Sequence, residues 1–339
     1  MRAKPALMPT IRDVSARAGV SVATVSRVMR SPEKVAPKTR RRVERAIQET
    51  GYQPNMLARS FRTNRSQLVL VLVPNIANPF FARVIRGIGQ VATEHGYDVL
   101  LGDTAYDPDR EDAYAQLVAT RRADGLIHLG SRMPRPVEAM VTAREVPLVS
   151  ACEVIEDHDG PAVAIDNTGA TERMTRHLAD LGHRVVGVVT GPKDNQHTRL
   201  RMEGYKRAAE AAGLSTLFVA EGAYDMPSGY EAVAKHEGRG VPDAVLCFND
   251  AMAVGAMRRL HEAGLSVPRD VSVTGFDDLQ LGRYVTPSLT TVSQPAEEMG
   301  RAAMRLFVEA MSGEGAQAAR VTLPTELIVR DSTGPAPKR

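Results

Sequence analysis

From Gln67 onward the chain alternates short β-rich runs with helical stretches, and this alternation occurs in two successive series. Such alternation predicts parallel sheets whose two faces are covered by helices. We therefore expect an α/β fold with two lobes of doubly wound parallel sheet. Lobe one takes about 67–165 and 296–330, because the segment after Ala296 is expected to be a helix that returns to it, and lobe two takes about 166–295.

The expected strand ends indicate where a ligand would bind. In open α/β sheets the ligand lies at the carboxyl ends of the strands. The loops that follow the expected strands should therefore face one cleft, with the connections near Asp166 and near 293–295 as hinges between the lobes. These loops are residues 74–81, 130–132, 191–201, 249–250 and 277–278.

A separate helical module precedes the alternating region. Thr10 and Asp13 have the spacing of a capping box, and the helix that they begin should end at Ala18 because Gly19 tolerates positive φ. Ser21 can then cap a second helix after a tight turn. This is helix-turn-helix spacing.

The second and third helices of this module have distinct inner and outer faces. Val25 and Val28 fall on the inner face of the second helix, and a third helix should begin at Pro37 and end before Gly51. The outer residues of the second helix are then free to reach bases or phosphates in a major groove. They are Val22, Ala23, Ser26 and Arg27.

Charge favours nucleic acid as the partner of this module. Residues 1–65 hold 15 Lys and Arg against 4 Asp and Glu, whereas the rest of the chain holds 28 against 36. The first segment therefore carries +11 and the remainder −8. Basic charge concentrated in this way favours binding to DNA through release of counterions from the phosphates.

A short helix is predicted between the module and the lobes, starting at Asn55 and ending near Thr63. A helix of this length does not hold alone in water. Its apolar residues therefore need a partner, which is either the same helix of a second subunit or a DNA minor groove opened by inserted side chains.

Composition and motifs exclude several other classes of protein. The chain has 339 residues, no apolar run of 18 and no signal-peptide pattern at its start, so we expect a cytoplasmic protein without a membrane span. Cys152 and Cys247 do not form a disulfide framework. An exported solute-binding protein is the main alternative class, but it leaves the basic module unexplained.

An enzyme is not expected, because the sequence lacks GxSxG, P-loop and HExxH motifs. The eight histidines show no metal-ligand spacing, and the adjacent pair Asp277 and Asp278 has no base or nucleophile beside it. We therefore expect no catalytic residue, no metal site and no cofactor.

Motifs along nearly the whole chain resemble those of the lactose/galactose-repressor family of transcriptional regulators. The segment from Thr10 to Val28 looks like the start of such a regulator. Later matches, in order, are Tyr52-Gln53-Pro54-Asn55, Asn78-Pro79-Phe80-Phe81, Ala123-Asp124-Gly125, Leu181-Gly182-His183, Arg201-Met202-Glu203-Gly204-Tyr205, Asn249-Asp250-Ala251, Gly275-Phe276-Asp277-Asp278 and Pro287-Ser288-Leu289-Thr290-Thr291.

This resemblance implies a homodimer on a pseudo-palindromic operator, with paired hinge helices in the minor groove. It divides the chain into a DNA-binding domain 1–54, a hinge 55–66 and an effector-binding core 67–339. Phe61 stands where relatives insert a leucine. The tail lacks leucine heptads, so no tetramer is expected. The residues that the resemblance assigns to DNA are Thr10, Ser21, Val22, Ala23, Thr24, Ser26, Arg27, Asn55, Ala58, Arg59 and Phe61.

The two lobes resemble periplasmic sugar-binding proteins, which implies a small-molecule effector between them. Aromatic side chains there can stack on a base or a sugar face, although ordinary core packing also explains the Phe pair. Arg201 and Asp277 can bind hydroxyls or ring nitrogens, or form a structural ion pair. The expected effector residues are Phe80, Phe81, Ser131, His197, Arg201, Tyr224, Asn249 and Asp277.

The identity of the effector is less constrained. Runs such as Asn78-Pro79-Phe80-Phe81 and Leu129-Gly130-Ser131-Arg132 are similar to the cytidine-repressor branch of the family, which favours a nucleoside such as cytidine. Asn195 stands where the purine-repressor branch has an arginine, which argues against a nucleobase corepressor. A sugar-responsive, a corepressor-dependent and an activating regulator remain alternatives.

Overall fold

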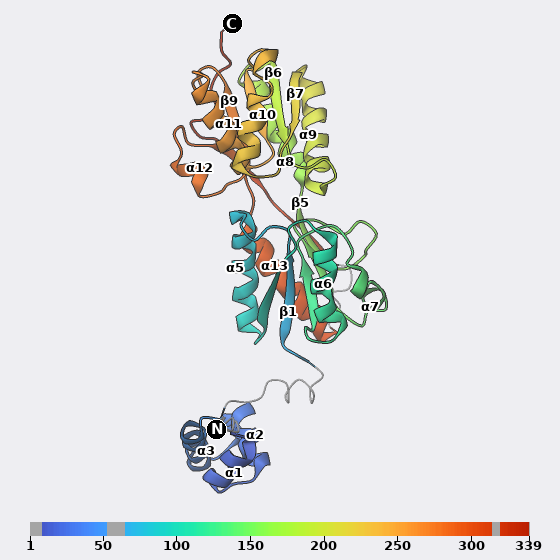
Figure 1. Ribbon diagram of the computed structural model, residues 1–339, viewed down its shortest axis with the longest axis vertical. Helices are drawn as coiled ribbons and strands as arrows, with labels where there is room; N and C mark the ends of the chain where they lie inside the picture. Colours follow the sequence, from blue (N-terminus) through green and yellow to red (C-terminus); the bar gives the residue numbers. More distant parts are fainter. Residues whose placement is uncertain (1–8, 53–64, 314–318, 339) are drawn as a thin grey trace, which may run out of the picture. The chain divides into compact units, whose positions relative to one another are not determined.

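The computed structural model describes residues 9–52, 65–313 and 319–338 and contains two compact units, Met1–Ser66 and Gln67–Arg339 (Figure 1). The expected hinge residues Asn55, Ala58, Arg59 and Phe61 lie outside the described residues.

The amino-terminal unit is the predicted three-helix module. Its helices are α1 (Ile11–Ala18), α2 (Val22–Arg30) and α3 (Pro37–Thr50), with a short 3-10 turn η1 (Pro32–Lys34) between the last two. Val14, Val25 and Val43, one from each helix, are fully buried together in its core. The capping predictions are confirmed, because Thr10 and Asp13 form the capping box and Gly19 has φ 57°.

The first lobe of the larger unit is a six-stranded sheet with helices on both faces (Figure 1). Its strand order is β11-β5-β4-β3-β1-β2, and every pairing in it is parallel. The strands are β1 (Leu68–Val73), β2 (Asp98–Asp103), β3 (Gly125–His128), β4 (Leu148–Ala151), β5 (Ala162–Ile165) and β11 (Arg320–Leu323). The helices are α5 (Pro79–Glu94), α6 (Pro108–Ala119), η2 (Arg135–Val137), α7 (Glu138–Thr142) and α13 (Ala296–Ser312).

The second lobe repeats this arrangement with the order β12-β10-β9-β8-β6-β7. Only β12 runs antiparallel to its neighbour, β10. Its strands are β6 (Val185–Thr190), β7 (Ser215–Glu221), β8 (Ala244–Cys247), β9 (Ser272–Asp277), β10 (Thr290–Ser293) and β12 (Glu326–Ile328). Its helices are α8 (Asn167–Asp180), α9 (Gln196–Ala212), α10 (Met226–Ala234), η3 (Glu237–Arg239), α11 (Asp250–Glu262) and α12 (Leu281–Tyr284).

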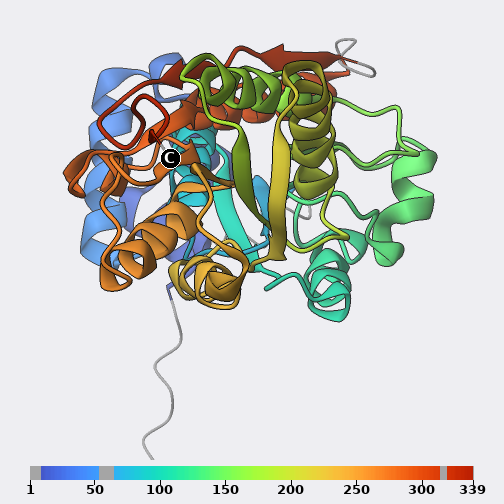
Figure 2. The same ribbon diagram turned by 90° about the horizontal axis from the view of Figure 1, so that it is seen from above.

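In both sheets the strand order reverses next to the first strand, at β1/β3 and at β6/β8. The carboxyl ends at such reversal points form a crevice, because successive helices leave towards opposite faces of the sheet. Figure 2 views the molecule from above and shows helices on both sides of the central strands. The predicted fold class, a helical amino-terminal module followed by two lobes of parallel sheet, is therefore confirmed.

The chain passes between the lobes three times. Two passages, between β5 and α8 and between β10 and α13, lie where the sequence places hinges. The third joins β11 to β12, which belong to different sheets. Lobe one was expected to extend to about residue 330, but it ends at Leu323, because β12 pairs with β10 of lobe two.

Helices α5 and α13 pack closely because glycines lie at their contact. A Cβ on Gly87 would lie 2.0 Å from the carbonyl oxygen of Glu297, whereas a Cβ on Gly89 of the same helix would meet nothing within 4 Å. We expect Gly87→Ala to lower the free energy of unfolding by about 1–3 kcal/mol through overpacking. Gly89→Ala should raise it by about 0.5–1 kcal/mol, because alanine favours helix.

Urea unfolding of the two variants measures this difference within one helix. Equal changes in the free energy of unfolding for the two substitutions would show that α5 and α13 can move apart to accept the added methyl group without loss of stability.

Candidate effector cleft and DNA-binding surface

A narrow polar cleft lies between the lobes, at the carboxyl ends of their strands. It contains about 30 Å³ of open space, enough for no more than a few water molecules. Four aromatic side chains and several charged or amide groups surround this space. The lining residues are Pro74, Asn78, Phe80, Phe81, Tyr106, Glu153, Asn195, His197, Arg201, Tyr224, Asn249, Asp277 and Gln294.

Seven of the eight residues expected to contact an effector line this cleft. They are Phe80, Phe81, His197, Arg201, Tyr224, Asn249 and Asp277. Ser131 does not: it lines a separate cavity of about 350 Å³ with residues such as Met133 and Ile155. The loop after β3 is held away from the cleft, because Arg132, next to Ser131, is paired with Glu111 and Asp112 of α6.

The structure adds residues to the cleft that the sequence did not assign to an effector. Tyr106 belongs to the loop after β2, and Gln294 lies in the passage between β10 and α13. The rule that identified the other loops also applies to β2, whose carboxyl end is at Asp103, so Tyr106 was predictable. The same rule applies to Gln294, which directly follows Ser293, the last residue of β10.

Arg201 is the most constrained cation of the cleft, with a side chain that is 3% exposed. Its Nε donates to Asn167 Oδ1 at 2.9 Å, and its Nη1 donates to the carbonyl oxygen of Phe248. The guanidinium carbon lies 3.6 Å from the centre of the Phe276 ring, a cation–π contact. These contacts orient the remaining guanidinium nitrogen towards Asp277, whose Oδ1 is 4.0 Å away.

Asp277 is a buried carboxylate at the end of β9. Burial raises its pKa to about 6, although Arg201 and a hydrogen bond from Gln294 lower it. Gln294 Nε2 donates to Oδ1 at 2.6 Å. The residue has φ 114°, a backbone conformation that costs a side-chain-bearing residue about 1–3 kcal/mol and is typical of functional loops. This carboxylate is thus ionised at neutral pH but weakly compensated.

Lobe one contributes the aromatic side of the cleft. Phe80 and Phe81 begin α5, where Asn78 caps the helix by accepting from the Phe80 amide. Their rings meet edge to face with centres 5.4 Å apart, and both are 5% exposed. Both therefore belong to the core and to the cleft at once.

Glu153 links this aromatic side to lobe two. Asn195 Nδ2 donates to Glu153 Oε1 at 2.6 Å, and His197 Nε2 lies 3.6 Å from the same oxygen. Burial lowers the pKa of His197 to about 4, against the opposing effect of Glu153. His197 is therefore neutral at pH 7.

Tyr224 closes the lobe-two side of the cleft. Its hydroxyl donates to Asn195 Oδ1 at 3.0 Å and pairs with Thr198 Oγ1 at 2.8 Å. Asn249 Nδ2 donates to the Tyr224 carbonyl oxygen at 3.0 Å, so this amide holds the loop in place. Burial raises the pKa of Tyr224 to about 12, which keeps the phenol protonated as a donor.

Direct bonds between the lobes hold the cleft nearly closed. Gln196 exchanges two hydrogen bonds of 2.9 Å with the backbone of Val154. At another point Arg83 of α5 donates to the carbonyl oxygen of Asp278 at 3.2 Å. A molecule larger than a few waters enters only when such bonds break.

Replacing His197 should change the stability of the protein in acid. The pKa of His197 in the folded state, about 4, lies below the ordinary 6.5, so the stability that this neutral histidine contributes is lost as pH falls from about 6.5 to about 4. We expect His197→Gln to gain stability relative to the parent over this window, by at most about 3 kcal/mol. Urea unfolding at intervals from pH 4.5 to 7.5 measures the difference.

In the parent protein, Asp277 changes the pH dependence of the free energy of unfolding in the opposite direction to His197. Its raised pKa makes the folded state bind its proton more tightly. The comparison between parent and variant removes that contribution. A pH-independent difference would show that His197 protonates normally in the folded state.

The surface that is expected to bind DNA lies on α2. Ser21 caps this helix by accepting from the Thr24 amide, and Val22, Ala23 and Arg27 are exposed. The prediction that Ser26 lies on the outer face is wrong. Its side chain is only 7% exposed, because its position beside Val25 turns this small side chain towards the packed side of the helix. Thr10 is committed to its capping box, where its hydroxyl donates to Asp13 Oδ2 at 2.8 Å.

A compact helix-turn-helix unit joined to a two-lobed core with a polar interlobe cleft defines a ligand-responsive DNA-binding regulator. Residues 10–55 match the family described as bacterial regulatory proteins, lacI family, and residues 175–333 match a periplasmic binding protein-like domain. Among residues 9–52, 65–313 and 319–338, no helix is long and apolar enough to cross a membrane.

Whole-chain comparisons agree. The chain is 37% identical over 331 residues to the HTH-type transcriptional repressor CytR of Escherichia coli, and the match covers 97% of each chain. It is similar to the solved transcriptional regulator CelR–cellobiose complex (33% identity, TM-score 0.72) over 96% of this chain and 99% of that one. It is also similar to the lac repressor dimer bound to operator and the anti-inducer ONPF (28% identity, TM-score 0.87), again over 96% and 99%. The chain belongs to the lacI family of transcriptional repressors, which are not enzymes.

Proposed function

We propose that this repressor binds a pseudo-palindromic operator as a homodimer and that a nucleoside such as cytidine, bound between the lobes, releases it. In this proposal 1–54 binds DNA, 55–66 is the hinge and 67–339 binds effector and dimerises. The resemblance of runs such as Asn78-Pro79-Phe80-Phe81 to the cytidine-repressor branch supports a nucleoside, and the similar lac repressor structure is a dimer bound to operator.

The chemistry of the cleft supports a flat polar effector. Phe80, Phe81, Tyr106 and Tyr224 provide aromatic faces on which a base can stack. Arg201 and Asp277 provide a donor and an acceptor side by side for its ring edge or for ribose hydroxyls. This combination of aromatic faces with a buried cation and carboxylate is the observation that carries the proposal.

A sugar is the second candidate. Aromatic rings also stack on the apolar face of a sugar, and the similar CelR structure is a complex with cellobiose. A nucleoside, by contrast, carries a planar base in addition to its ribose, and the base can stack on the aromatic side chains of the cleft.

We infer that binding proceeds through an open state, because the closed cleft holds about 30 Å³. Opening breaks interlobe bonds such as Gln196–Val154 and Arg83–Asp278. An effector that replaces these bonds with its own then selects a different arrangement of the lobes. In the repressor, this rearrangement separates the hinges and lowers the affinity for the operator.

A thermal-shift screen of the full chain against cytidine, uridine, adenosine, free bases and common sugars tests the effector. A ligand present at 100 times its Kd stabilises the native state by about 2.7 kcal/mol. Stabilisation by nucleosides alone, with release of operator DNA by the same compound, supports the proposal. Stabilisation by a sugar alone overturns the nucleoside and keeps the repressor.

Arg27 should read sequence rather than only phosphate. We expect Arg27→Ala to reduce discrimination at one base pair of each half-site by about 1–3 kcal/mol while binding elsewhere in the site is kept. Binding to a set of single-base operator variants at fixed salt measures this. The control is Arg121→Ala, which removes an exposed arginine that follows α6. A uniform loss over all the operator variants would show that Arg27 contacts only the backbone.

A further inference from the structure

Lobe two contains a further cavity that shares no lining residue with the cleft. It has a volume of about 390 Å³, within the range of small-molecule sites. Pro242 precedes β8 and Leu265 follows α11, so the cavity lies at the end of the sheet opposite the cleft. Most of its lining is apolar, namely Phe218, Val233, Val241, Pro242, Val245, Leu260, Ala263 and Leu265.

The aromatic side of this cavity is rigid. Phe218 of β7 stacks on the ring of His236, with centres 4.4 Å apart and planes 18° from parallel. Gly187 leaves room for the phenyl ring, because a Cβ there would lie 2.4 Å from it. A flat molecule therefore meets a preformed flat surface.

The charged groups of the cavity already neutralise one another. Arg259 Nη2 lies 2.5 Å from Glu237 Oε1, and both residues line the cavity. A ligand with a net charge would have to compete with this ion pair. An uncharged ligand leaves it intact.

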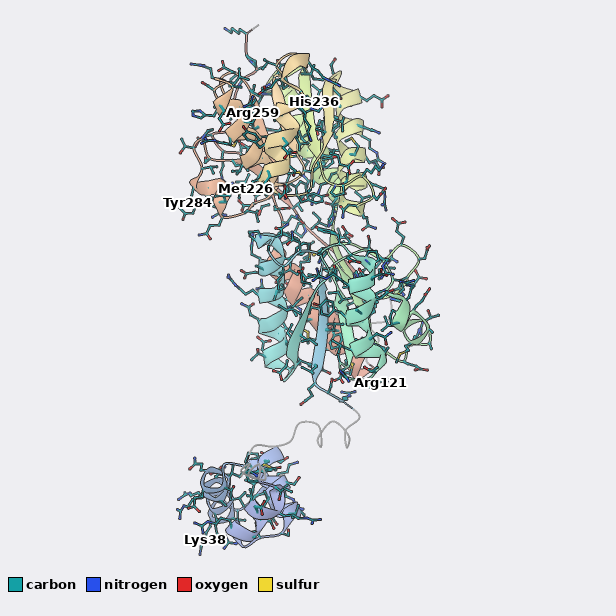
Figure 3. The ribbon with its side chains drawn as sticks, viewed as in Figure 1. Lys38, Arg121, Met226, His236, Arg259 and Tyr284 are labelled. Atoms are coloured by element: carbon teal, nitrogen blue, oxygen red, sulfur yellow. The ribbon has the colours of Figure 1, made fainter. Side chains whose placement is uncertain are left out.

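His236 provides a specific polar contact. Its Nδ1 lies 2.8 Å from the Ala232 carbonyl oxygen, and because a carbonyl can only accept, Nδ1 carries the proton. In the neutral ring Nε2 is then an acceptor. Within the described residues the structure gives this nitrogen no hydrogen-bond partner. Figure 3 labels His236 and Arg259 in lobe two.

We propose that this cavity is a second ligand site, separate from the effector cleft, and that it takes an uncharged, flat heteroaromatic molecule with one N–H or O–H donor. The apolar lining buries the rings, the Phe218–His236 pair stacks against them, and His236 accepts the donor.

Indole is a suitable probe, and benzofuran is its counterpart without the N–H. The chain contains no tryptophan, so the fluorescence of indole can be followed directly in the presence of the protein. At pH 8 we expect saturable binding of one indole per chain with a blue-shifted emission. Benzofuran, measured by its displacement of indole, should bind about 2- to 10-fold more weakly, the value of one neutral hydrogen bond.

Substitutions that fill the cavity test whether indole binds in it. Ala263→Phe fills its mouth at an exposed position, and Val241→Phe fills it from another side, so a folding defect in one does not decide the test. Both should weaken indole binding at least tenfold. The control is Val219→Phe, which adds the same ring on the opposite face of β7 and should leave binding unchanged.

His236→Phe keeps the stacking ring and removes the acceptor, so it should abolish the preference of the protein for indole over benzofuran. Absence of saturable binding, or indole binding that neither cavity variant weakens, would overturn the proposal. Equal affinities of the parent protein for indole and benzofuran would also overturn it, because the site would then not recognise a donor.

Discussion

Asp277→Asn should produce a repressor that still binds its operator but responds only to much higher concentrations of effector. The carboxylate is buried beside Arg201 in the cleft, and the substitution keeps the acceptor that Gln294 uses. The amide has nearly the same shape, but it loses the negative charge and has a donor nitrogen in place of one acceptor oxygen. A hydrogen bond to a charged group contributes about 1.5–3 kcal/mol, so effector affinity should fall about 10- to 150-fold.

The same substitution should stabilise the ligand-free protein. The pKa of Asp277 is raised to about 6, so its ionisation costs stability, and the cost grows as pH rises from about 4 to about 6 and then stays constant. Above pH 7 we expect Asp277→Asn to raise the free energy of unfolding by about 1–3 kcal/mol. Below pH 4 the difference should vanish.

Calorimetric titration with effector, operator binding without effector and urea unfolding at pH 4 and 8 measure the three parts of this prediction. Glu210→Gln on the outer side of α9 is the control for loss of one carboxylate. Unchanged effector affinity in Asp277→Asn would remove this carboxylate from the binding site.

Arg201→Met should have the largest effect on stability. The guanidinium is buried among Asn167, Phe248 and the Phe276 ring, and it is the nearest cation to Asp277. Its removal leaves a buried carboxylate without compensation, which typically costs about 3–5 kcal/mol. The loss should be smaller at pH 5, where Asp277 is largely protonated and needs no cation.

A double-mutant cycle separates this charge effect from packing. The double variant Arg201→Met with Asp277→Asn should recover much of the stability that Arg201→Met loses, because no buried charge remains unpaired. Urea unfolding at pH 8 gives all four corners of the cycle. Additive effects would indicate that Arg201 stabilises the lobe through Asn167 and Phe248 alone.

The sequence predicted the fold well because its signals are local. The capping box at Thr10, the stop at Gly19 and the strand-helix alternation each depend on neighbouring residues. The carboxyl-end rule then brought residues as distant as Phe80 and Asp277 to one cleft, since the parallel strands of each sheet end at one edge and residues from both of these edges line the cleft.

The failures of prediction depend on contacts that no local pattern encodes. Ser131 follows a strand like the other cleft residues, but ion pairs of Arg132 with α6 hold its loop in another cavity. The bond between Glu153 and Asn195 joins two lobes, so neither residue signals it alone. The sequence did not assign β12 to lobe two. The chain passes from β11 in one sheet to β12 in the other, and no hydrophobic periodicity marks such a passage.

The three passages between the lobes limit how the cleft can open. They join β5 to α8, β10 to α13 and β11 to β12, and each runs from the carboxyl end of a strand in one lobe directly into the other lobe. A single connecting segment would let one lobe rotate freely about it. Three connecting segments instead bend together about one axis and resist twisting. Opening is therefore restricted to nearly one degree of freedom. In the function proposed above, an effector bound between the lobes would therefore displace one lobe as a whole along this single path.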